Sequence, residues 1–256
     1  RGAQAIVAHE SLSEGALEAA NHLDLPVFLV ANTDDTVAGM ISLRQVAHGN
    51  PMANRADQAQ DLAVVLTSLG TTGEASIVPM RHRNLIARST TTAGLLELTP
   101  EDRGLNMNKL YLGGGLLNLH VCLLTGGSVI VMPRIEPDAF FEHLSALEPT
   151  WYVGSFTVNK AIYEAALNRP QPVDTGRLRM VRTSSGAINS DVAENLEKLF
   201  GVSVIEAFAS TEAGRMAGNP QPPGLRKRGT VGPPAGCEMV ILDEDGNQVD
   251  TGESGE

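Results

Sequence analysis

Apolar and polar residues follow one another in two kinds of block, short apolar runs and longer amphipathic segments. AQAIVA at 3–8 and PVFLVA at 26–31 are typical of buried strands, and LSEGALEAANHL at 12–23 between them has helical spacing. The same alternation continues from residue 62 to residue 208. Strands that alternate with helices of ten to fifteen residues indicate βαβ units, so the pattern predicts an α/β fold of parallel sheets with helices on both faces.

The pattern also divides the chain into four parts. We predict a partial α/β subdomain at 1–48, a polar connector at 49–60, a main α/β subdomain at 61–228 and the start of a small antiparallel β unit at 229–256, where turn pairs such as Asp245-Gly246 occur. In the main subdomain the predicted strands are 62–67, 128–132, 150–154, 178–184 and 202–208, and the predicted helices are 83–98, 116–125, 137–147, 156–168 and 190–200.

Composition narrows the classes of function. Of the 256 residues, 42% are apolar, which is enough for a packed core, and 30 acidic against 19 basic residues give a net charge of −11, which disfavours nucleic acid as a partner. Cys122 and Cys237 are too few for a disulfide framework, so we expect a cytoplasmic setting. The most apolar run, 116–132, is interrupted by polar residues and glycines, so we expect no membrane span.

The segment TSLGTTG at 67–73 is the first candidate for chemistry. Gly70 and Gly73 can adopt positive φ, and hydroxyl groups and successive backbone N–H groups can form a nest for an anion. We expect this loop to lie between strand 62–67 and helix 83–98, where it would hold phosphate. An ordinary glycine- and threonine-rich turn explains the same residues.

Two further loops follow predicted strands. In ASTEAG at 209–214, the hydroxyl of Thr211 can donate to a phosphate oxygen and the carboxylate of Glu212 can hold Mg²⁺. The alternative is helix capping, with Ser210 or Thr211 as the N-cap. In TSSGAI at 183–188, small residues would let a flat ring approach the backbone. Ligands of parallel sheets bind at such loops.

In this order, the segments resemble the adenylate-forming superfamily of AMP-dependent synthetases and ligases, and its acyl-CoA synthetase branch most closely. LTSLGTTGEASIVPMRHRNL at 66–85 is similar to the phosphate loop of that family and the helix after it. EAFASTEAG at 206–214 resembles its Tyr-Gly-x-Thr-Glu motif, 111–164 resembles its acyl-pocket segment, and 229–256 resembles the segment that follows.

The resemblance implies flavodoxin-like subdomains and a two-step reaction. A carboxylic acid reacts with ATP, aided by Mg²⁺, to give acyl-AMP, and coenzyme A then displaces AMP. Thr211 and Glu212 would be catalytic, with Glu212 as the metal ligand. The residues implied for ATP or AMP are Thr67, Ser68, Gly70, Thr71, Thr72, Gly73, Gly186, Ala187, Ile188, Glu206, Ala207, Phe208, Ala209, Ser210 and Thr211. Those implied for the acyl group are Tyr111, Leu112, Gly113, Gly114, Val153, Gly154 and Thr157.

Several positions depart from the pattern of the family. Ala75 and Ser76 stand where the family has Pro-Lys, Leu112 replaces a histidine, and Phe208-Ala209 replaces Tyr-Gly. The resemblance also implies that the ribose-binding aspartate, the hinge and the C-terminal lid of the family are missing, so we expect weak activity or none from this chain alone.

Three hypotheses therefore stay open: a fragment of an AMP-forming acyl-CoA synthetase, a non-catalytic module that binds a nucleotide or acyl-adenylate, and a structural remnant that forms homo-oligomers through exposed sheet edges. The acyl substrate is not specified, although a role in fatty acid metabolism is expected. The stretch 107–116 contains no acid, which disfavours an amino-acid substrate. Its cation, Lys109, fits an anionic group on the substrate or an exposed loop position.

Overall fold

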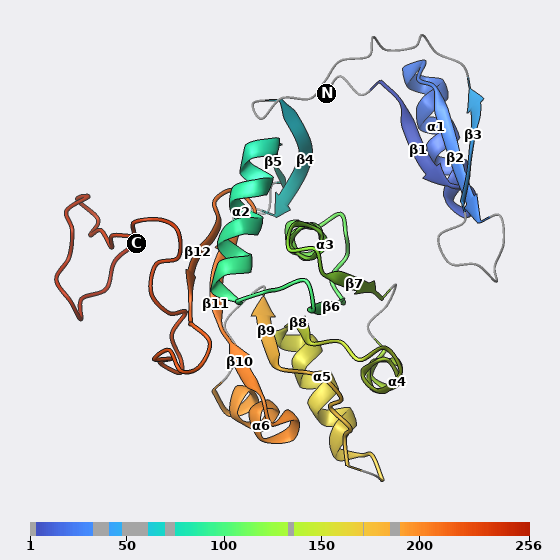
Figure 1. Cartoon of the computed structure of the whole chain (residues 1–256). Helices are drawn as coiled ribbons and strands as arrows, with labels where there is room; N and C mark the ends of the chain where they lie inside the picture. Colours follow the sequence, from blue (N-terminus) through green and yellow to red (C-terminus); the bar gives the residue numbers. More distant parts are fainter. Residues whose placement is uncertain are drawn as a thin grey trace. The chain divides into compact units, whose positions relative to one another are not determined.

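The computed structural model describes residues 4–32, 41–47, 61–69, 75–132, 136–170, 172–184 and 190–256 (Figure 1). The chain divides into two compact units, Arg1–Asp57 and Gln58–Glu256. The predicted connector 49–60 lies outside the described residues. The predicted boundaries of the four parts stay predictions.

The first unit is one βαβ motif with an added strand. It contains β1 (Ile6–His9), the 3₁₀ turn η1 (Glu10–Leu12), α1 (Ser13–Leu23), β2 (Val27–Asn32) and β3 (Ile41–Ala47). β1 and β2 are parallel, as the alternation of strand and helix predicted, and β3 pairs with β2 in the antiparallel direction. The strand β3 was not predicted. The apolar contacts centre on Ala20, Val27 and Leu29, so the core of this unit is small.

The second unit begins with a β-hairpin and a helix. β4 (Leu62–Leu69) and β5 (Ala75–Arg81) pair in the antiparallel direction, and α2 (His82–Leu95) follows β5. The predicted phosphate loop therefore connects two strands, and its expected place between a strand and a helix was wrong. β5 escaped prediction because Pro79 interrupts it, yet a two-stranded hairpin has edges at which a missing N–H is tolerated.

A five-stranded parallel sheet forms the centre of this unit. Its strands are β6 (Arg103–Asn106), β7 (Ser128–Val131), β8 (Trp151–Ser155), β9 (Met180–Ser184) and β10 (Ser203–Ile205), in the order β10-β9-β8-β6-β7. The helices α3 (Gly113–Leu124), α4 (Pro137–Leu147), α5 (Phe156–Leu167) and α6 (Ser190–Phe200) alternate with them. The predicted α/β class with helices on both faces is confirmed. β6 was missed because the sequence RGLN carries a glycine and polar residues at both ends.

Alternate side chains of the strands enter two separate apolar clusters. On one face, Leu105, Tyr152 and Val181 pack with residues of α4, α5 and α6, including Phe140 and Phe200. On the other face, toward α2 and α3, the cluster contains Leu96, Val121, Cys122, Trp151, Val153, Met180 and Ile205. The alternation along each strand is the period-2 pattern of a sheet that is covered on both sides (Figure 1).

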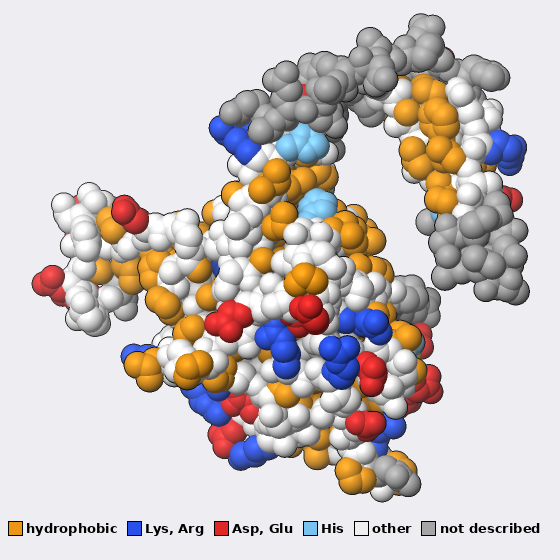
Figure 2. Space-filling model, viewed as in Figure 1, with side chains coloured by type: hydrophobic (Ala, Val, Ile, Leu, Met, Phe, Trp, Pro, Cys, Tyr) orange, Lys and Arg blue, Asp and Glu red, His pale blue; other side chains and the backbone are white. Residues whose placement is uncertain are grey.

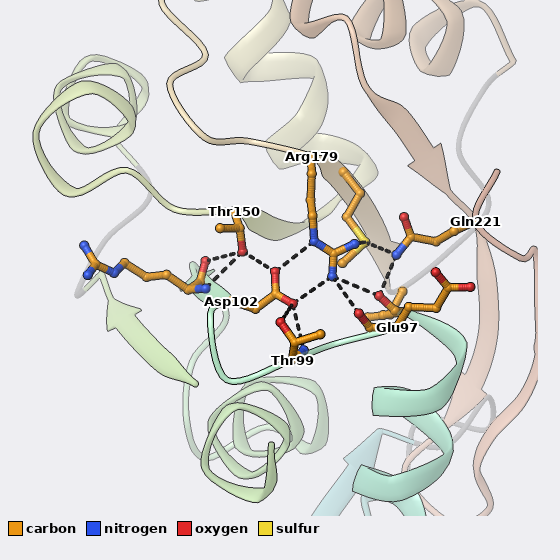
Figure 3. Close-up of polar contacts among 9 residues, drawn as sticks. Glu97, Thr99, Asp102, Thr150, Arg179 and Gln221 are labelled. Carbon is orange, nitrogen blue, oxygen red and sulfur yellow. Dashed lines mark hydrogen bonds and ion pairs between the residues drawn. The ribbon is translucent and has the colours of Figure 1, made fainter. Parts of the chain in front are cut away.

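The amino ends of the strands are joined by a buried polar network (Figure 3). Arg179, just before β9, donates from Nε and Nη2 to the two carboxylate oxygens of Asp102, at 2.8 and 2.9 Å. Thr150, just before β8, donates its hydroxyl to Asp102 at 2.6 Å. Arg179 also donates to the carbonyl of Leu96, and Gln221 donates to the same carbonyl. These bonds fix the end of α2 and three strand starts in one arrangement.

The chain after β10 differs from the prediction. The predicted strand 202–208 is two strands, because β10 ends at Ile205 and β11 (Ala207–Ser210) pairs with β12 (Gly214–Gly218) in a separate antiparallel hairpin. Beyond β12 the chain makes two isolated antiparallel bridges, Ala217 with Pro234 and Leu242 with Gln248. The predicted turn at Asp245-Gly246 is formed, with the Gly246 N–H donating to the Asp243 carbonyl at 3.1 Å.

On the face that Figure 2 draws, acidic and basic side chains of the second unit are mixed, and apolar side chains lie beside histidine side chains over α2 and α3. There a hollow of about 360 Å³ is lined by His82, Leu85, Ile86, Ser89, His120, Leu123 and Leu124. Among the helices that the structure describes, none has the length and apolar character needed to cross a membrane.

Candidate active site

One hydrogen bond joins the strand before the predicted phosphate loop to the predicted catalytic turn. Ser68 of β4 donates its hydroxyl to Oε1 of Glu212 at 2.6 Å. The two residues are far apart in sequence, so the tertiary fold alone brings them together. This bond from Ser68 is the main cause that lowers the pKa of the Glu212 carboxyl, and the positive charge of Arg88 adds to it. Glu212 is exposed, and its carboxylate is therefore ionised and accessible at neutral pH.

The turn that carries Thr211 and Glu212 is a hairpin connection. The Ser210 hydroxyl accepts a hydrogen bond from the Ala213 N–H at 3.0 Å. Gly214 has φ +79°, and a Cβ there would come within 2.9 Å of the Arg88 side chain, so both backbone and space require glycine. The chain then returns as β12, and no helix begins at Ser210 or Thr211. The helix-capping alternative was therefore wrong.

Arg88 of α2 forms a hydrogen bond with the backbone of this turn. Its Nη1 donates to the backbone carbonyl of Thr211 at 3.2 Å and contacts the Met80 sulfur at 3.0 Å. Burial lowers the pKa of Arg88, and the negative charge of Glu212 opposes that effect. Arg88 thus connects α2, β5 and the turn in one structure.

The start of α3 lies against the same turn. A Cβ on Gly113 would lie 3.5 Å from the Thr211 hydroxyl and 3.6 Å from the Leu66 side chain. A Cβ on Gly115 would meet the Lys109 carbonyl at 2.2 Å, so this glycine serves close packing of the backbone. Of the predicted acyl segment, Gly113 is therefore the part that reaches the Thr-Glu turn.

The other predicted acyl residues lie in different surroundings. Tyr111 and Leu112 are exposed on the loop before α3, and Lys109 is exposed with its ammonium 5.6 Å from the ring of Tyr111, as expected for a loop lysine. Val153 is fully buried in the cluster that faces α2 and α3, and Thr157 is exposed on α5. A Cβ on Gly154 would clash with the Asn159 amide at 2.7 Å, and Gly114 is near Asn108. Nothing in these contacts assigns them to a ligand.

The predicted nucleotide residues are described in part. Gly70, Thr71, Thr72 and Gly73, and likewise Gly186, Ala187 and Ile188, lie outside the described residues. Thr67 is exposed at the end of β4, and Glu206 follows β10 with burial as the main cause that raises its pKa. On β11, Ala207 and Phe208 pair with Gly218 and Ala217, and Ala209 lies opposite Arg215. Phe208 is 46% exposed.

Two buried arginines beside this turn were missed by the sequence analysis. Arg182 of β9 donates from Nη1 to Oδ1 of Asn118 on α3 at 3.1 Å, and Asn118 in turn donates to Asn106 on β6. Arg215 of β12 is 5% exposed, and among the described residues none of its three guanidinium nitrogens has a hydrogen-bond partner. A signal did exist, since each arginine interrupts a strand of apolar or small residues, LRMVRTS or GRMAG.

The electrostatics of the two arginines are unusual. Burial lowers the pKa of Arg182 to about 10, and the charge of Arg88 adds to this effect. Burial lowers the pKa of Arg215 to about 8, and repulsion by Arg182 adds to it. Burial and Arg88 also lower the pKa of His120 on α3. Arg88, Arg182 and Arg215 therefore lie close enough to one another for each charge to affect the next.

The comparisons with known proteins agree with the observed fold. Residues 2–256 match the family of AMP-binding enzymes, so this chain belongs to that family. The chain is 34% identical to an oxalate–CoA ligase of Saccharomyces cerevisiae over 201 residues, which cover 78% of this chain and 36% of that protein. It is 30% identical to a sulfoacetate–CoA ligase of Cupriavidus necator over 236 residues, which cover 91% of this chain and 45% of that protein.

A solved structure shares the same fold. ATP-bound MatB from Rhodopseudomonas palustris matches 98% of this chain with a TM-score of 0.76 at 24% identity, and the match covers 49% of that protein. The chain thus spans less than half the length of these relatives. The predicted resemblance to adenylate-forming enzymes is confirmed.

Proposed function

We propose that this chain carries the nucleotide- and acid-binding part of an AMP-forming acid–thiol ligase, which converts a carboxylic acid, ATP and coenzyme A to an acyl-CoA, AMP and pyrophosphate. The observation that carries the proposal is the hydrogen bond from Ser68 to Glu212, with Gly113 beside Thr211. These contacts bring together Ser68, Gly113 and the turn of Thr211 and Glu212, the three segments to which we assign phosphate, acid and metal binding. Membership of the AMP-binding family and the CoA ligases among its relatives support the proposal.

The reaction has two steps. A carboxylate oxygen of the acid attacks the α-phosphorus of ATP, the bond from that phosphorus to the bridging oxygen breaks, and pyrophosphate leaves. The sulfur of coenzyme A, having lost its proton to solvent, then attacks the acyl carbon, and the bond from that carbon to the AMP oxygen breaks. The protein contributes by positioning the reactants and by stabilising the charge that develops in the transition state.

Each part of the site has a role in this proposal. The hydroxyl and N–H groups of 67–73 hold the β- and γ-phosphates, and the Thr211 hydroxyl donates to a phosphate oxygen. In this proposal Phe208, which is 46% exposed, stacks on one face of the adenine, and residues 186–188, which lie outside the described residues, are assigned to the other face. Arg88 positions the turn through the Thr211 carbonyl.

Glu212 fits a magnesium ion. Its carboxylate is exposed, and Ser68 and Arg88 lower its pKa, so it presents a charged oxygen ligand. No group of three or more metal-binding side chains occurs in the described part of the chain. Mg²⁺ suits such a site because one carboxylate, water and the substrate phosphates complete its coordination. When bound, the ion would neutralise negative charge on the phosphates.

Two measurements, made one after the other, test the proposal: nucleotide binding and then adenylate formation. Thermal unfolding is measured with and without Mg·ATP, and acyl-AMP is then assayed with a panel of acids. Ligand at a hundred times its Kd stabilises the folded state by about 2.7 kcal/mol, which raises the Tm by several degrees. Glu212→Gln should reduce this shift, while Glu238→Gln, at an exposed position, should not. No shift with Mg·ATP would overturn the proposal.

A second candidate is a module that binds nucleotide without chemistry. Ser76 favours it, because β5 places Ser76 directly opposite Ser68 in the hairpin, at the position where the family carries lysine. A Tm shift with Mg·ATP but no acyl-AMP with any acid would support this candidate.

Self-association is a third candidate. The hairpin exposes Leu62, Val65 and Ile77, which are large apolar side chains on strands without further partners among the described residues. Light scattering at high concentration tests it, and a strictly monomeric chain would exclude it. We propose a cytoplasmic location for all three candidates, because Cys122 and Cys237 are both free thiols.

A further inference from the structure

The hollow between α2 and α3 is formed by one face of each helix. Its volume is about 360 Å³, which lies within the range of small-molecule pockets. The four α2 residues that line it, from His82 to Ser89, are spaced i, i+3, i+4 and i+7. The three α3 residues, from His120 to Leu124, are spaced i, i+3 and i+4. Each set therefore lies on one side of its helix.

The walls of this hollow are apolar and reach the solvent (Figure 2). Ile86, Leu123 and Leu124 are all exposed, and neither of the two clusters that pack on the sheet contains them. Large apolar side chains that gather at one exposed place on a folded protein mark a site where another molecule binds. The two helix faces therefore favour a ligand with an apolar body.

One buried polar atom at the hollow has no partner in the described part of the chain. Ser89 is 2% exposed, and its hydroxyl oxygen forms no hydrogen bond with any described residue. A buried hydroxyl without a partner costs free energy, and nearly all buried polar groups in folded proteins are hydrogen-bonded. Because Ser89 lines the hollow, its hydroxyl favours a ligand whose inner end carries a hydrogen-bonding atom.

The lining also selects against charge on the ligand. Apart from His82 and His120, the described residues that line the hollow are leucines, an isoleucine and a serine. Burial and the positive charge of Arg88 lower the pKa of His120, so its imidazole is neutral at pH 7. A charged group beside the Ser89 hydroxyl would lose hydration without gaining an ion pair, which is costly. The lining therefore favours an uncharged ligand.

The hollow is separate from the residues to which we assign nucleotide and metal. A smaller cavity of about 10 Å³ shares Leu85, Ser89 and His120 with it and extends to Gly113, beside the turn of Thr211. This cavity has room for about one water molecule, so a ligand in the hollow does not reach that turn as the side chains stand.

We propose that the hollow between α2 and α3 is a second binding site, which takes a small uncharged molecule with an apolar body and one hydrogen-bonding oxygen. The oxygen bonds to the Ser89 hydroxyl, and the body lies against Ile86, Leu123 and Leu124. The proposed reaction uses none of these four side chains, so this inference goes beyond the proposed function and does not depend on it.

An NMR titration of the 256-residue chain, labelled with ¹³C at the isoleucine methyl groups, tests the inference. The probes are benzyl alcohol, toluene, which lacks the oxygen, and benzylamine, which carries a positive charge and is not an acid. The methyl resonance of Ile86 reports on the hollow. The methyl resonance of Ile162, which is buried among the helices on the other face of the sheet, is the internal control.

Two pairs of variants locate the binding. Ser89→Ala removes the unpartnered hydroxyl, and Thr90→Ala removes a hydroxyl from an exposed position of the same helix. Leu123→Gln changes the apolar wall at a residue that is 64% exposed, and Leu167→Gln makes the same change on α5 at a residue that is 65% exposed. Circular dichroism confirms the fold of each variant.

We expect benzyl alcohol to shift the Ile86 resonance and to bind about three- to tenfold more tightly than toluene or benzylamine, the value of one neutral hydrogen bond. Ser89→Ala should abolish the advantage of benzyl alcohol over toluene and leave toluene binding unchanged. Leu123→Gln should weaken the binding of both by about fivefold, since it removes apolar contact area. Thr90→Ala and Leu167→Gln should behave as wild type.

The inference is wrong if none of the probes shifts the Ile86 resonance at tens of millimolar. It is also wrong if toluene or benzylamine binds as tightly as benzyl alcohol, or if Ser89→Ala leaves the order of the affinities unchanged. An Ile86 resonance that moves with protein concentration alone would identify the hollow as a contact between copies of the chain and would reject the ligand site. Titration with Mg·ATP tests the proposed function separately, so either can fail while the other stands.

Discussion

At the amino ends of β6, β8 and β9, the buried carboxylate of Asp102 pairs with the guanidinium of Arg179. On the side of β9 and β12 that faces α2, two buried guanidiniums, of Arg182 and Arg215, have no carboxylate partner among the residues that the structure describes. Arg179 and Arg182 are only three residues apart, at the start of and within the same strand. Arg179 donates to both oxygens of Asp102 and to two backbone carbonyls. Arg182 has one partner, the amide of Asn118, and Arg215 beside it has none among the described residues.

The pKa values follow the same division. Burial by itself would raise the pKa of Asp102, but hydrogen bonds from Arg179 and Thr150 lower it, so the carboxylate is stable in its charged form. For Arg182 and Arg215 the pKa is lowered by burial, and neighbouring cations lower it further. At the amino ends of the strands the charge of Asp102 is therefore compensated by hydrogen bonds, whereas the charges of Arg182 and Arg215 are opposed by burial and by neighbouring cations.

The largest effect is expected from Arg179→Met. Arg179 is itself partly exposed, but its removal leaves the buried carboxylate of Asp102 without its cation, so we expect a loss of about 3 kcal/mol in the free energy of unfolding. Urea denaturation measures the change, and Arg177→Met at an exposed position is the matched control. A loss below about 1 kcal/mol would show that the Asp102 network does not stabilise the sheet.

Asp102→Asn should have the next largest effect on the free energy of unfolding. At pH 7 we expect a loss of about 1.5–3 kcal/mol, the value of hydrogen bonds to a charged group. Because the folded state holds the pKa of Asp102 below its ordinary value of 3.8, the unfolded state takes up the proton first as the pH falls. The stability that this charge contributes is present above pH 4 and is lost as the pH falls below it.

Urea midpoints of wild type and Asp102→Asn at pH 7, 5, 4 and 3 check this expectation. The difference between the two proteins should shrink steadily below pH 4. A difference that stays constant down to pH 3 would mean that the charge of Asp102 is not what stabilises the folded chain.

Arg215→Met should act in the opposite direction. Removing an unpaired buried cation while keeping most of its volume should raise the free energy of unfolding by about 1–3 kcal/mol in the absence of ligand. Urea denaturation measures this change in the free energy of unfolding. Arg215→Met should raise that free energy, whereas Arg179→Met should lower it. If both substitutions lower the free energy of unfolding, Arg215 stabilises the fold as Arg179 does, and the expected difference between the two arginines is wrong.

Ser76→Lys should give the smallest effect. In the hairpin, Ser76 pairs directly with Ser68, so its side chain projects on the same face as the one that reaches Glu212. A lysine there adds a cation at the exposed end of the site, and we expect Mg·ATP to bind about tenfold more tightly, or about 1.4 kcal/mol. Calorimetric titration with Mg·ATP measures it, and Ser76→Gln controls for size. Unchanged affinity would reject the idea that Ser76 weakens phosphate binding.

Much of the fold could be predicted because it depends on local pattern. The helices 137–147 and 190–200 have the predicted bounds, and most other elements from 62 onward agree within a few residues. The strands that the pattern missed include β3 in the first unit, β5, which contains a proline, and β6 and β12, which are short and rich in glycine or polar residues. Such strands form because neighbouring strands and helices cover them. A pattern of apolar and polar residues over four or five positions is too short to predict this covering.

The order of most helices and strands, the family, and the candidate roles of Thr211 and Glu212 could be inferred from the sequence, since the spacing of hydroxyl, carboxylate and glycine residues is a local property of the chain. The hydrogen bond from Ser68 to Glu212, the pairing of Asp102 with Arg179, and the lack of a described partner for Arg215 became apparent from the packing of the folded chain. Whether a buried charge has a partner depends on elements distant in sequence that pack in one place. The pKa of each arginine therefore depends on the groups within hydrogen-bond distance of its guanidinium and on how far packing excludes water from it.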